Sequence, residues 1–99
     1  MEKGGCIYIL TNKNNTTLYT GVTADLPGRV IEHKERIYPK CFTSRYNVTK
    51  LIYFEMFHSI EEAIEREKQI KGGSRWRKER LIALMNPEWR DLYDDVKYW

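Results

Sequence analysis

The alternation of side chains near the start of the chain predicts a β-hairpin. From position 6 to position 10, successive residues of an extended strand would point to opposite faces of a sheet, with Cys6, Tyr8 and Leu10 on one face and Ile7 and Ile9 on the other. The run Asn-Lys-Asn-Asn at 12–15 is typical of a turn, because Asn tolerates positive φ and bonds its own backbone. A β-branched and aromatic run at 16–19 resumes the extended pattern. Antiparallel pairing across the turn would bring Tyr8 and Tyr19 together.

Capping residues and helical periodicity predict three helices after the hairpin. The first spans about 25–36, with Asp25 as its N-cap and a proline in its first turn. The second begins at a capping box, Ser-Ile-Glu-Glu at 59–62, and stops at the glycine pair 72–73. The third spans about 74–85, with Ser74 as its cap, and ends at an Asn-Pro pair.

The apolar positions of these helices predict which side chains turn inward. A stripe facing the core recurs every three or four residues along a helix. The expected inward residues are Leu26, Val30 and Ile37 in the first helix, Ala63, Ile64 and Ile70 in the second, and Trp76, Leu81, Leu84 and Met85 in the third.

A third strand is predicted at 49–57. Its near-continuous apolar run at 51–54 favours a strand that is covered on both faces, and therefore a central place in the sheet. The preceding stretch, 37–47, has no clean period and contains Pro39, so it is expected to be a surface loop. This loop fits a plain connector and a DNA-contacting loop equally well.

Together these elements predict an α/β fold with a three-stranded, mainly antiparallel sheet flanked by helices, in the order ββαβαα. The 99 residues have the length of one ordinary domain, so 1–99 is expected to form a single unit. The segment 87–99 carries Trp89, Leu92, Tyr93 and Trp99 and is expected to pack back onto the core.

The charge distribution changes the picture more than the net charge of +3 does. Basic residues cluster at 66–80 and at 34–45, whereas the last part of the chain is acidic. Clustered cations favour a polyanionic partner, although a solvated helix face would look similar. The candidate nucleic-acid-binding residues are Lys40, Arg45, Lys68, Lys71, Arg75, Arg77 and Lys78.

Other functional classes receive little support from the sequence. No apolar window is long enough to cross a membrane, and the first residues lack a signal-peptide core. Cys6 and Cys41 have neither a disulfide framework nor zinc-ligand spacing, and the simpler interpretation is a reducing, cytoplasmic location.

One group of residues suggests chemistry on a phosphate diester. Tyr8 and Tyr19 lie on the predicted hairpin, and Arg29 and His33 are four residues apart, so they share one face of the first helix. An arginine can bind a phosphate in a bidentate manner, and a phenol or an imidazole can position or deprotonate water. The tyrosines could instead be ordinary core aromatics of a hairpin.

These residues also carry a resemblance to a known family. Cys6-Ile7-Tyr8 and Tyr19-Thr20-Gly21 resemble the two signature triplets of the GIY-YIG nucleases, and Arg29 and His33 stand where that family's helix places its catalytic arginine and its histidine or tyrosine. The likeness covers roughly residues 4–86 and is greatest to small, stand-alone bacterial members related to the N-terminal domain of the DNA-repair nuclease excinuclease C.

The resemblance implies a role for each candidate residue. Tyr8 would be the general base or the group that positions the attacking water, with Tyr19 as the second choice and His33 as a proton relay. Arg29 would bind the scissile phosphate. Glu67 would hold one Mg²⁺ or Mn²⁺ ion. Asn86 would correspond to the family's late asparagine, which steadies the site.

The sequence departs from the family pattern at three positions. Cys6 and Thr20 replace apolar or small residues of the triplets whose side chains carry no chemistry in the family. Val22 stands where some members place a lysine near the phosphate, so turnover could be slower or supported differently.

The resulting hypothesis is a metal-dependent endonuclease that hydrolyses phosphodiester bonds of DNA, in repair or other DNA processing. Since relatives with defined targets usually carry appended domains, weak sequence specificity or a protein partner that supplies the target is expected. The main alternative is a nucleic-acid-binding module that does not cleave. A third is an adaptor whose aromatic C-terminal segment contacts other proteins.

Overall fold

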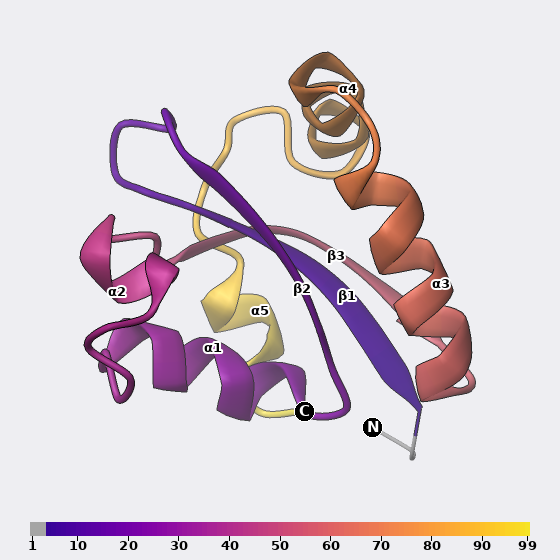
Figure 1. The fold of residues 1–99 in the computed structure, drawn as a ribbon, viewed down its shortest axis with the longest axis horizontal. Helices are drawn as coiled ribbons and strands as arrows, with labels where there is room; N and C mark the ends of the chain where they lie inside the picture. Colours follow the sequence, from indigo (N-terminus) through magenta and orange to yellow (C-terminus); the bar gives the residue numbers. More distant parts are fainter. Residues whose placement is uncertain (1–3) are drawn as a thin grey trace.

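The first strand of the predicted hairpin forms the middle of the sheet. The computed structural model describes residues 4–99, and in this range β1 (Gly5–Thr11) pairs antiparallel with β2 (Leu18–Thr23) on one side and with β3 (Lys50–Phe57) on the other (Figure 1). β1 is buried along its whole length. The expected α/β fold with an antiparallel sheet is therefore confirmed, and the strand order is β2-β1-β3.

β3 lies at an edge of the sheet, so its predicted central position is wrong. Its apolar run has a different cause, which is an irregularity in the pairing with β1: Ile9 faces Tyr53, but Leu10 faces Leu51. The extra residue, Ile52, joins the same hydrophobic cluster as Tyr53 instead of pointing to the opposite face. The open side of β3 is also covered, because the backbone N–H of Leu92 donates to the Leu51 carbonyl at 2.7 Å.

The two faces of β1 are buried by different helices, as the alternation predicted. Cys6, Tyr8 and Leu10 pack with α1 (Leu26–Lys34) and with α5 (Tyr93–Val96). Ile7 and Ile9 pack with α3 (Ile60–Lys71) and α4 (Arg75–Met85). Figure 1 shows α1 and α5 on one side of the sheet and α3 and α4 on the other.

The three predicted N-caps are confirmed. The side chains of Asp25, Ser59 and Ser74 accept hydrogen bonds from backbone N–H groups in the first turns of α1, α3 and α4, at 3.2, 3.2 and 3.3 Å. Such caps satisfy donors that a helix cannot satisfy internally, which fixes the start of each helix.

Several side chains predicted to face inward are exposed. They are Ile37, Ile64, Trp76, Leu84 and Met85, with Leu84 87% and Trp76 61% exposed. In α4 the apolar residues are spread around the helix, so they cannot all share one face, and Ile82 is the fully buried one. The exposed Trp76 therefore needs an explanation other than core packing.

The stretch predicted to be a surface loop contains a short helix, α2 (Phe42–Arg45). Lys40 and Arg45 are exposed, but Thr43 and Ser44 are buried. The backbone of Thr43 accepts a hydrogen bond from Val48 N–H at 2.8 Å, which joins α2 to the start of β3. The surface-loop prediction thus fails for the middle of this stretch.

The chain after α4 returns to the sheet. The Asn86 side chain donates to the carbonyls of Ile52 and Arg90, at 3.1 and 2.8 Å. Leu92 and Val96 are buried in the hydrophobic cluster that α1 forms with one face of the sheet. Lys34 and Asp91 form an ion pair between α1 and this segment. Across residues 4–99 no helix is both long enough and apolar enough to span a membrane.

Candidate active site

The phenol of Tyr8 lies directly over Gly21. The two residues are opposite each other in the β1–β2 pairing. A Cβ atom added to Gly21 would lie 2.4 Å from both Cζ and the hydroxyl oxygen of Tyr8, which is far inside van der Waals contact. Glycine in the second triplet therefore makes room for the tyrosine of the first, and it lets the phenol cross onto the edge strand β2.

The two tyrosines and the histidine form a compact cluster, as the hairpin and helix spacing predicted. The ring centroids are 6.3 Å apart for Tyr8 and Tyr19, 5.9 Å for Tyr8 and His33, and 5.7 Å for Tyr19 and His33. The Tyr8 hydroxyl is 3.1 Å from His33 Nε2. Because His33 is only 4% exposed, this contact is protected from water.

A second hydrogen bond holds the other side of the imidazole. His33 Nδ1 lies 2.8 Å from Oγ1 of Thr43 on α2. Both ring nitrogens are thus engaged, which fixes the plane of the ring. In the sequence, Thr43 is only a polar residue of an expected loop. Nothing in the periodicity of 37–47 indicates that it is buried against a histidine ten positions earlier.

Burial makes both groups of this pair neutral at ordinary pH. It raises the pKa of Tyr8 to about 12, although the nearby Arg29 guanidinium acts in the opposite direction. Burial, aided by the positive charge of Arg29, lowers the pKa of His33 to about 4. A neutral imidazole keeps one nitrogen free to accept a proton, so Nε2 can accept the hydrogen bond of the Tyr8 hydroxyl.

Arg29 lies at the margin of this cluster. It is one helical turn before His33 on α1, and its side chain is 33% exposed. Its Nη1 donates to Glu32 Oε1 at 3.4 Å, and its guanidinium lies 5.8 Å from the centre of the Tyr38 ring. The group is therefore close to Tyr8 and His33, which it affects electrostatically, and still accessible to an anion from solvent.

Glu67 approaches the same edge of the sheet from the opposite layer. It belongs to α3, its side chain is only 15% exposed, and Lys71 Nζ lies 3.3 Å from its Oε2. Its charge contributes to raising the pKa of Tyr8, which places the carboxylate within electrostatic reach of the phenol. The site therefore straddles β2, with α1 on one side and α3 on the other.

A hollow of about 320 Å³ is lined by Lys71 and by residues of β2. Tyr19, Thr20, Phe42 and Lys78 are among the residues that line it. Thr20 is 5% exposed, and its hydroxyl has no hydrogen-bond partner among the described residues. A buried hydroxyl without a partner is costly, which suggests that water or a ligand normally satisfies it.

These donors fit a hydrated divalent ion better than a closed metal site. Residues 4–99 contain no group of three or more His, Cys, Asp or Glu side chains that could hold a metal. Glu67 nevertheless offers a hard carboxylate beside Lys71, which lines the same hollow as Thr20. Mg²⁺ typically keeps several waters and binds through one or two carboxylates plus substrate phosphate.

Two sequence-level candidates lie apart from this cluster. Asn86 is bonded to β3, at the edge of the sheet opposite β2. Arg75 donates to the carbonyls of Thr16 and Asn15, both at 2.7 Å, and so clamps the hairpin turn to α4. Five other candidate nucleic-acid-binding residues are exposed: Lys40, Arg45, Lys68, Lys71 and Arg77.

Comparison with known proteins identifies one family. The model of the GIY-YIG catalytic domain matches residues 4–80. A UPF0213 protein of Syntrophus aciditrophicus is 39% identical over 82 residues, which is 83% of this chain and 92% of the relative. A UPF0213 protein of Natronomonas pharaonis is 39% identical over 77 residues, covering 78% of this chain and 88% of the relative.

A solved structure leads to the same family. The solution NMR structure of a UPF0213 protein from Bacillus halodurans is 30% identical, with a TM-score of 0.55, and the match covers 88% of this chain and 90% of that one. Like these relatives, the chain is small, and the family match includes both triplets, Arg29, His33 and Glu67. The chain therefore belongs to the GIY-YIG family of nuclease-type hydrolases.

Proposed function

We propose that this protein is a metal-dependent endonuclease that hydrolyses phosphodiester bonds of DNA with little sequence specificity. GIY-YIG nucleases act on nucleic acids and generally use a divalent metal. The observation that carries the proposal is the meeting of two layers at β2: Tyr8, Arg29 and His33 from one side, and the partly buried Glu67 from the other.

In this proposal Arg29 binds the scissile phosphate. Its guanidinium is positioned on the first helix, is weakly paired with Glu32, and remains one-third exposed. A planar guanidinium can donate two parallel hydrogen bonds to phosphate oxygens and can stabilise the charge that develops on them in the transition state.

The Tyr8–His33–Thr43 chain moves the proton. The phenol stays protonated at neutral pH, because burial raises the pKa of Tyr8 to about 12. Tyr8 can take a proton from the attacking water only as its own hydroxyl proton passes to His33 Nε2, 3.1 Å away. A phosphate on Arg29 would offset the positive charge that helps to lower the pKa of His33, so substrate binding itself would make His33 a better proton acceptor.

Glu67 is the residue proposed to hold Mg²⁺ or Mn²⁺. When bound, the ion would supply positive charge to the phosphate and the leaving oxygen. The Glu67 carboxylate must exchange its contact with Lys71 for this role, and the freed ammonium would remain beside the phosphate. In that position Lys71 would provide the positive charge that some family members obtain from a lysine at the position of Val22.

The surface around the site suits a nucleic acid backbone. Exposed basic residues lie in or just before α2, at Lys40 and Arg45, and also on α3 and α4. The two groups lie on either side of β2. We propose that a protein partner supplies target choice and that the protein works in DNA repair or processing in the cytoplasm. DNA is favoured over RNA by the family resemblance alone.

The test is incubation of the purified protein with supercoiled, branched and single-stranded DNA, in Mg²⁺ or Mn²⁺ and in a chelator. We expect metal-dependent nicking that Glu67→Gln abolishes. The matched control is Glu65→Gln, which changes an exposed carboxylate on the same helix and should leave the rate unchanged. Metal-dependent nicking that persists at the wild-type rate in Glu67→Gln would exclude this carboxylate as the metal ligand.

Arg29→Ala should reduce the cleavage rate by about 10²–10³, the loss typical of removing one donor to transition-state charge. The thermal unfolding midpoint should hardly change, since the side chain is partly exposed and its ion pair with Glu32 is long. Cleavage rates under single-turnover conditions measure the effect. An unchanged rate would remove Arg29 from the mechanism.

The alternative function, nucleic-acid binding without cleavage, is favoured by one observation. Glu67 is already paired with Lys71, so a metal must compete with an ammonium group for the same carboxylate. Salt-dependent DNA binding by the wild-type protein, with no cleavage in either metal, would support this alternative over the nuclease.

A further inference from the structure

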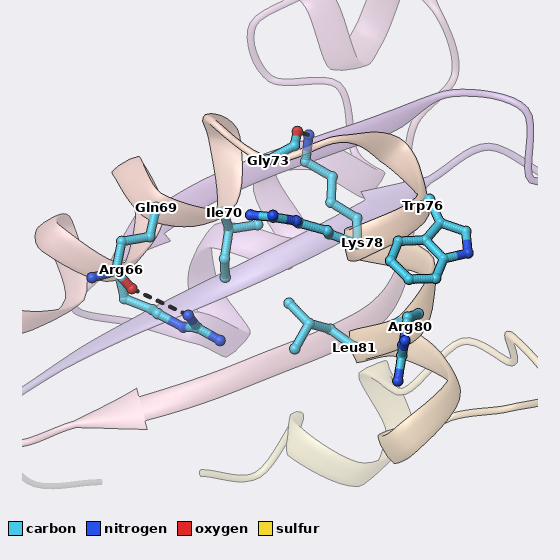
Figure 2. Close-up of a pocket in the computed structure, with 9 residues that line it drawn as sticks. Arg66, Gln69, Ile70, Gly73, Trp76, Lys78, Arg80 and Leu81 are labelled. Carbon is cyan, nitrogen blue, oxygen red and sulfur yellow. Dashed lines mark hydrogen bonds between the residues drawn. The ribbon is translucent and has the colours of Figure 1, made fainter.

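A groove between α3 and α4 has no role in the site described above. Its volume is about 470 Å³. Figure 2 shows Arg66 and Gln69 at one end, Trp76 and Arg80 at the other, and Ile70 and Leu81 between them. The groove thus combines an apolar floor with polar and aromatic side chains along its rim.

The charge of this groove has one sign. Four basic residues of the described chain line it, and none of the described residues that line it is acidic. They are Arg66, Arg77, Lys78 and Arg80. Arg66 already binds Glu55 through two hydrogen bonds of 2.9 and 3.1 Å, whereas Lys78 donates, among residues 4–99, only to the Gly73 carbonyl at a long 3.3 Å. Arg77, Lys78 and Arg80 are therefore the cations that an anionic ligand would meet.

Trp76 is the second distinctive feature of the groove. It is 61% exposed and belongs to neither hydrophobic cluster of the sheet. The Arg80 guanidinium lies 4.9 Å from the ring centre, which helps to orient the indole. A large, oriented aromatic ring beside basic side chains is the combination on which proteins stack the bases of single strands.

Lys78 connects this groove to the candidate active site. It lines both the groove with Trp76 and the hollow with Tyr19 and Thr20 beside β2. The hollow beside β2 and the groove with Trp76 are therefore neighbours that share Lys78. None of the described residues that line either depression is acidic.

We propose that this groove binds a single-stranded stretch of the nucleic acid substrate, with a base stacked on Trp76 and the flanking phosphates on Arg77 and Lys78. That the ligand is a nucleic acid rests on the proposed function. The groove adds a preference for substrates that have an unpaired segment next to the cleaved bond. Duplex DNA cannot use the indole in this way, because its bases are already stacked on one another.

Binding is tested separately from cleavage, in a chelator, with a fluorescein-labelled oligothymidylate and with a duplex of the same length. We expect Trp76→Ala to weaken binding of the oligothymidylate by about 5- to 100-fold, the range of losses for one stacked base, and to change duplex binding little. Trp76→Phe should retain most of the affinity because it keeps an aromatic face.

Trp99→Ala is the matched control. Trp99 is also partly exposed, at 41%, but it packs edge-on against Phe54 in the other layer of the molecule. It should leave oligothymidylate binding unchanged. Arg77→Gln provides a second variant, and it should weaken binding to both ligands and reduce the salt dependence.

Equal oligothymidylate affinity in wild type and Trp76→Ala would overturn the proposal. So would equal loss of duplex and single-strand binding, or displacement of the oligothymidylate by polyglutamate as effectively as by unlabelled oligothymidylate, since both outcomes would indicate a general anion or acidic-protein surface. If the expected binding pattern is found and no DNA is cut in Mg²⁺ or Mn²⁺, the nuclease proposal fails while the groove assignment stands.

Discussion

At the scale of single residues, Gly21 decides where the Tyr8 phenol can lie. The phenol occupies the space that any side chain at position 21 would need, with Tyr8 Cζ 2.4 Å from the site of the missing Cβ. The hydroxyl then reaches His33 Nε2. The tyrosine of one triplet and the glycine of the other thus act as one unit, which explains physically why these residue types occur together.

Gly21→Ala should therefore displace Tyr8, destabilise the fold by about 1–3 kcal/mol through overpacking, and greatly reduce cleavage. Urea unfolding and cleavage assays on the same preparation measure both effects. Gly73→Ala is the matched control, because a Cβ at that position meets its nearest neighbour at 3.4 Å, an ordinary contact. Equal stability and activity in the two variants would show that the crowding at Gly21 is relieved without consequence.

His33 should make the stability of the protein depend on pH in a defined window. Its pKa is lowered from 6.5 to about 4 in the folded state. Between these values the unfolded chain binds a proton that the native protein does not, so stability falls as pH falls from about 6.5 towards 4 and is unaffected above that window. The loss due to this residue is at most about 3 kcal/mol.

The prediction is checked by denaturant unfolding at several pH values. His33→Gln should remove the part of the pH dependence that lies in this window, although its stability near pH 7 will differ from that of the wild type. His58→Gln, at an exposed position, should keep the wild-type profile. Parallel profiles for wild type and His33→Gln would contradict the assignment of the buried neutral imidazole.

At the scale of elements, α2 is the part of the fold that the site depends on and that periodicity does not reveal. This short helix presents Phe42 to Tyr19, with ring centroids 6.2 Å apart, and Thr43 to His33. It does so with only four residues, too few to show a helical period. Its place is fixed by contacts to α1, β2 and the start of β3.

Thr43→Val should keep the shape of the side chain but remove the partner of His33 Nδ1. We expect the turnover rate to fall by about tenfold, as for other residues that orient a reactive imidazole, with little change in KM. Thr43→Ser should restore most of the rate. A change in KM alone, or no rescue by serine, would show that Thr43 acts through packing and not through the hydrogen bond.

The contrast between predicted and observed elements follows from the range of the interactions. Asp25, Ser59 and Ser74 each accept a hydrogen bond from a donor three residues away, so their caps can be identified from the sequence alone. The extra residue in β3, Ile52, depends on its pairing with β1, about forty positions earlier in the chain. The partnership of Thr43 and His33 likewise depends on how the intervening chain folds, and no local pattern encodes it.

The candidate site shows the same division. Tyr8 and Tyr19 come together within one hairpin, and Arg29 and His33 lie one helical turn apart, so both relations can be predicted from local pairing and spacing. The contacts of His33 with the two tyrosines depend instead on how α1 packs against the sheet. The inward face of α4 was predicted wrongly, because its apolar residues do not form a single stripe. That error concealed Trp76, whose exposure is the basis for the groove proposed above.

At the scale of the whole molecule, opposite charges are sorted between surfaces. The acidic residues near the C-terminus are paired: Asp95 with Arg90 and Asp94 with Lys97 within the segment, and Asp91 with Lys34 of α1. The basic residues of α3 and α4 are paired less completely and lie beside the hollow next to β2 and the groove with Trp76. A net charge of only +3 therefore still produces a concentrated positive surface around the site.

This arrangement predicts a steep salt dependence of duplex DNA binding. If the positive surface neutralises about four phosphates, the logarithm of the binding constant should fall with a slope of roughly −3 to −4 against the logarithm of the salt concentration. Lys68→Gln and Arg77→Gln should each reduce the slope by about one, because each removes one phosphate contact. Lys97→Gln, which removes a basic residue from the acidic C-terminal segment, should leave the slope unchanged. Fluorescence anisotropy titrations over a range of salt concentrations measure the slopes, and a flat response in the wild type would mean that these helices do not form a phosphate-binding face.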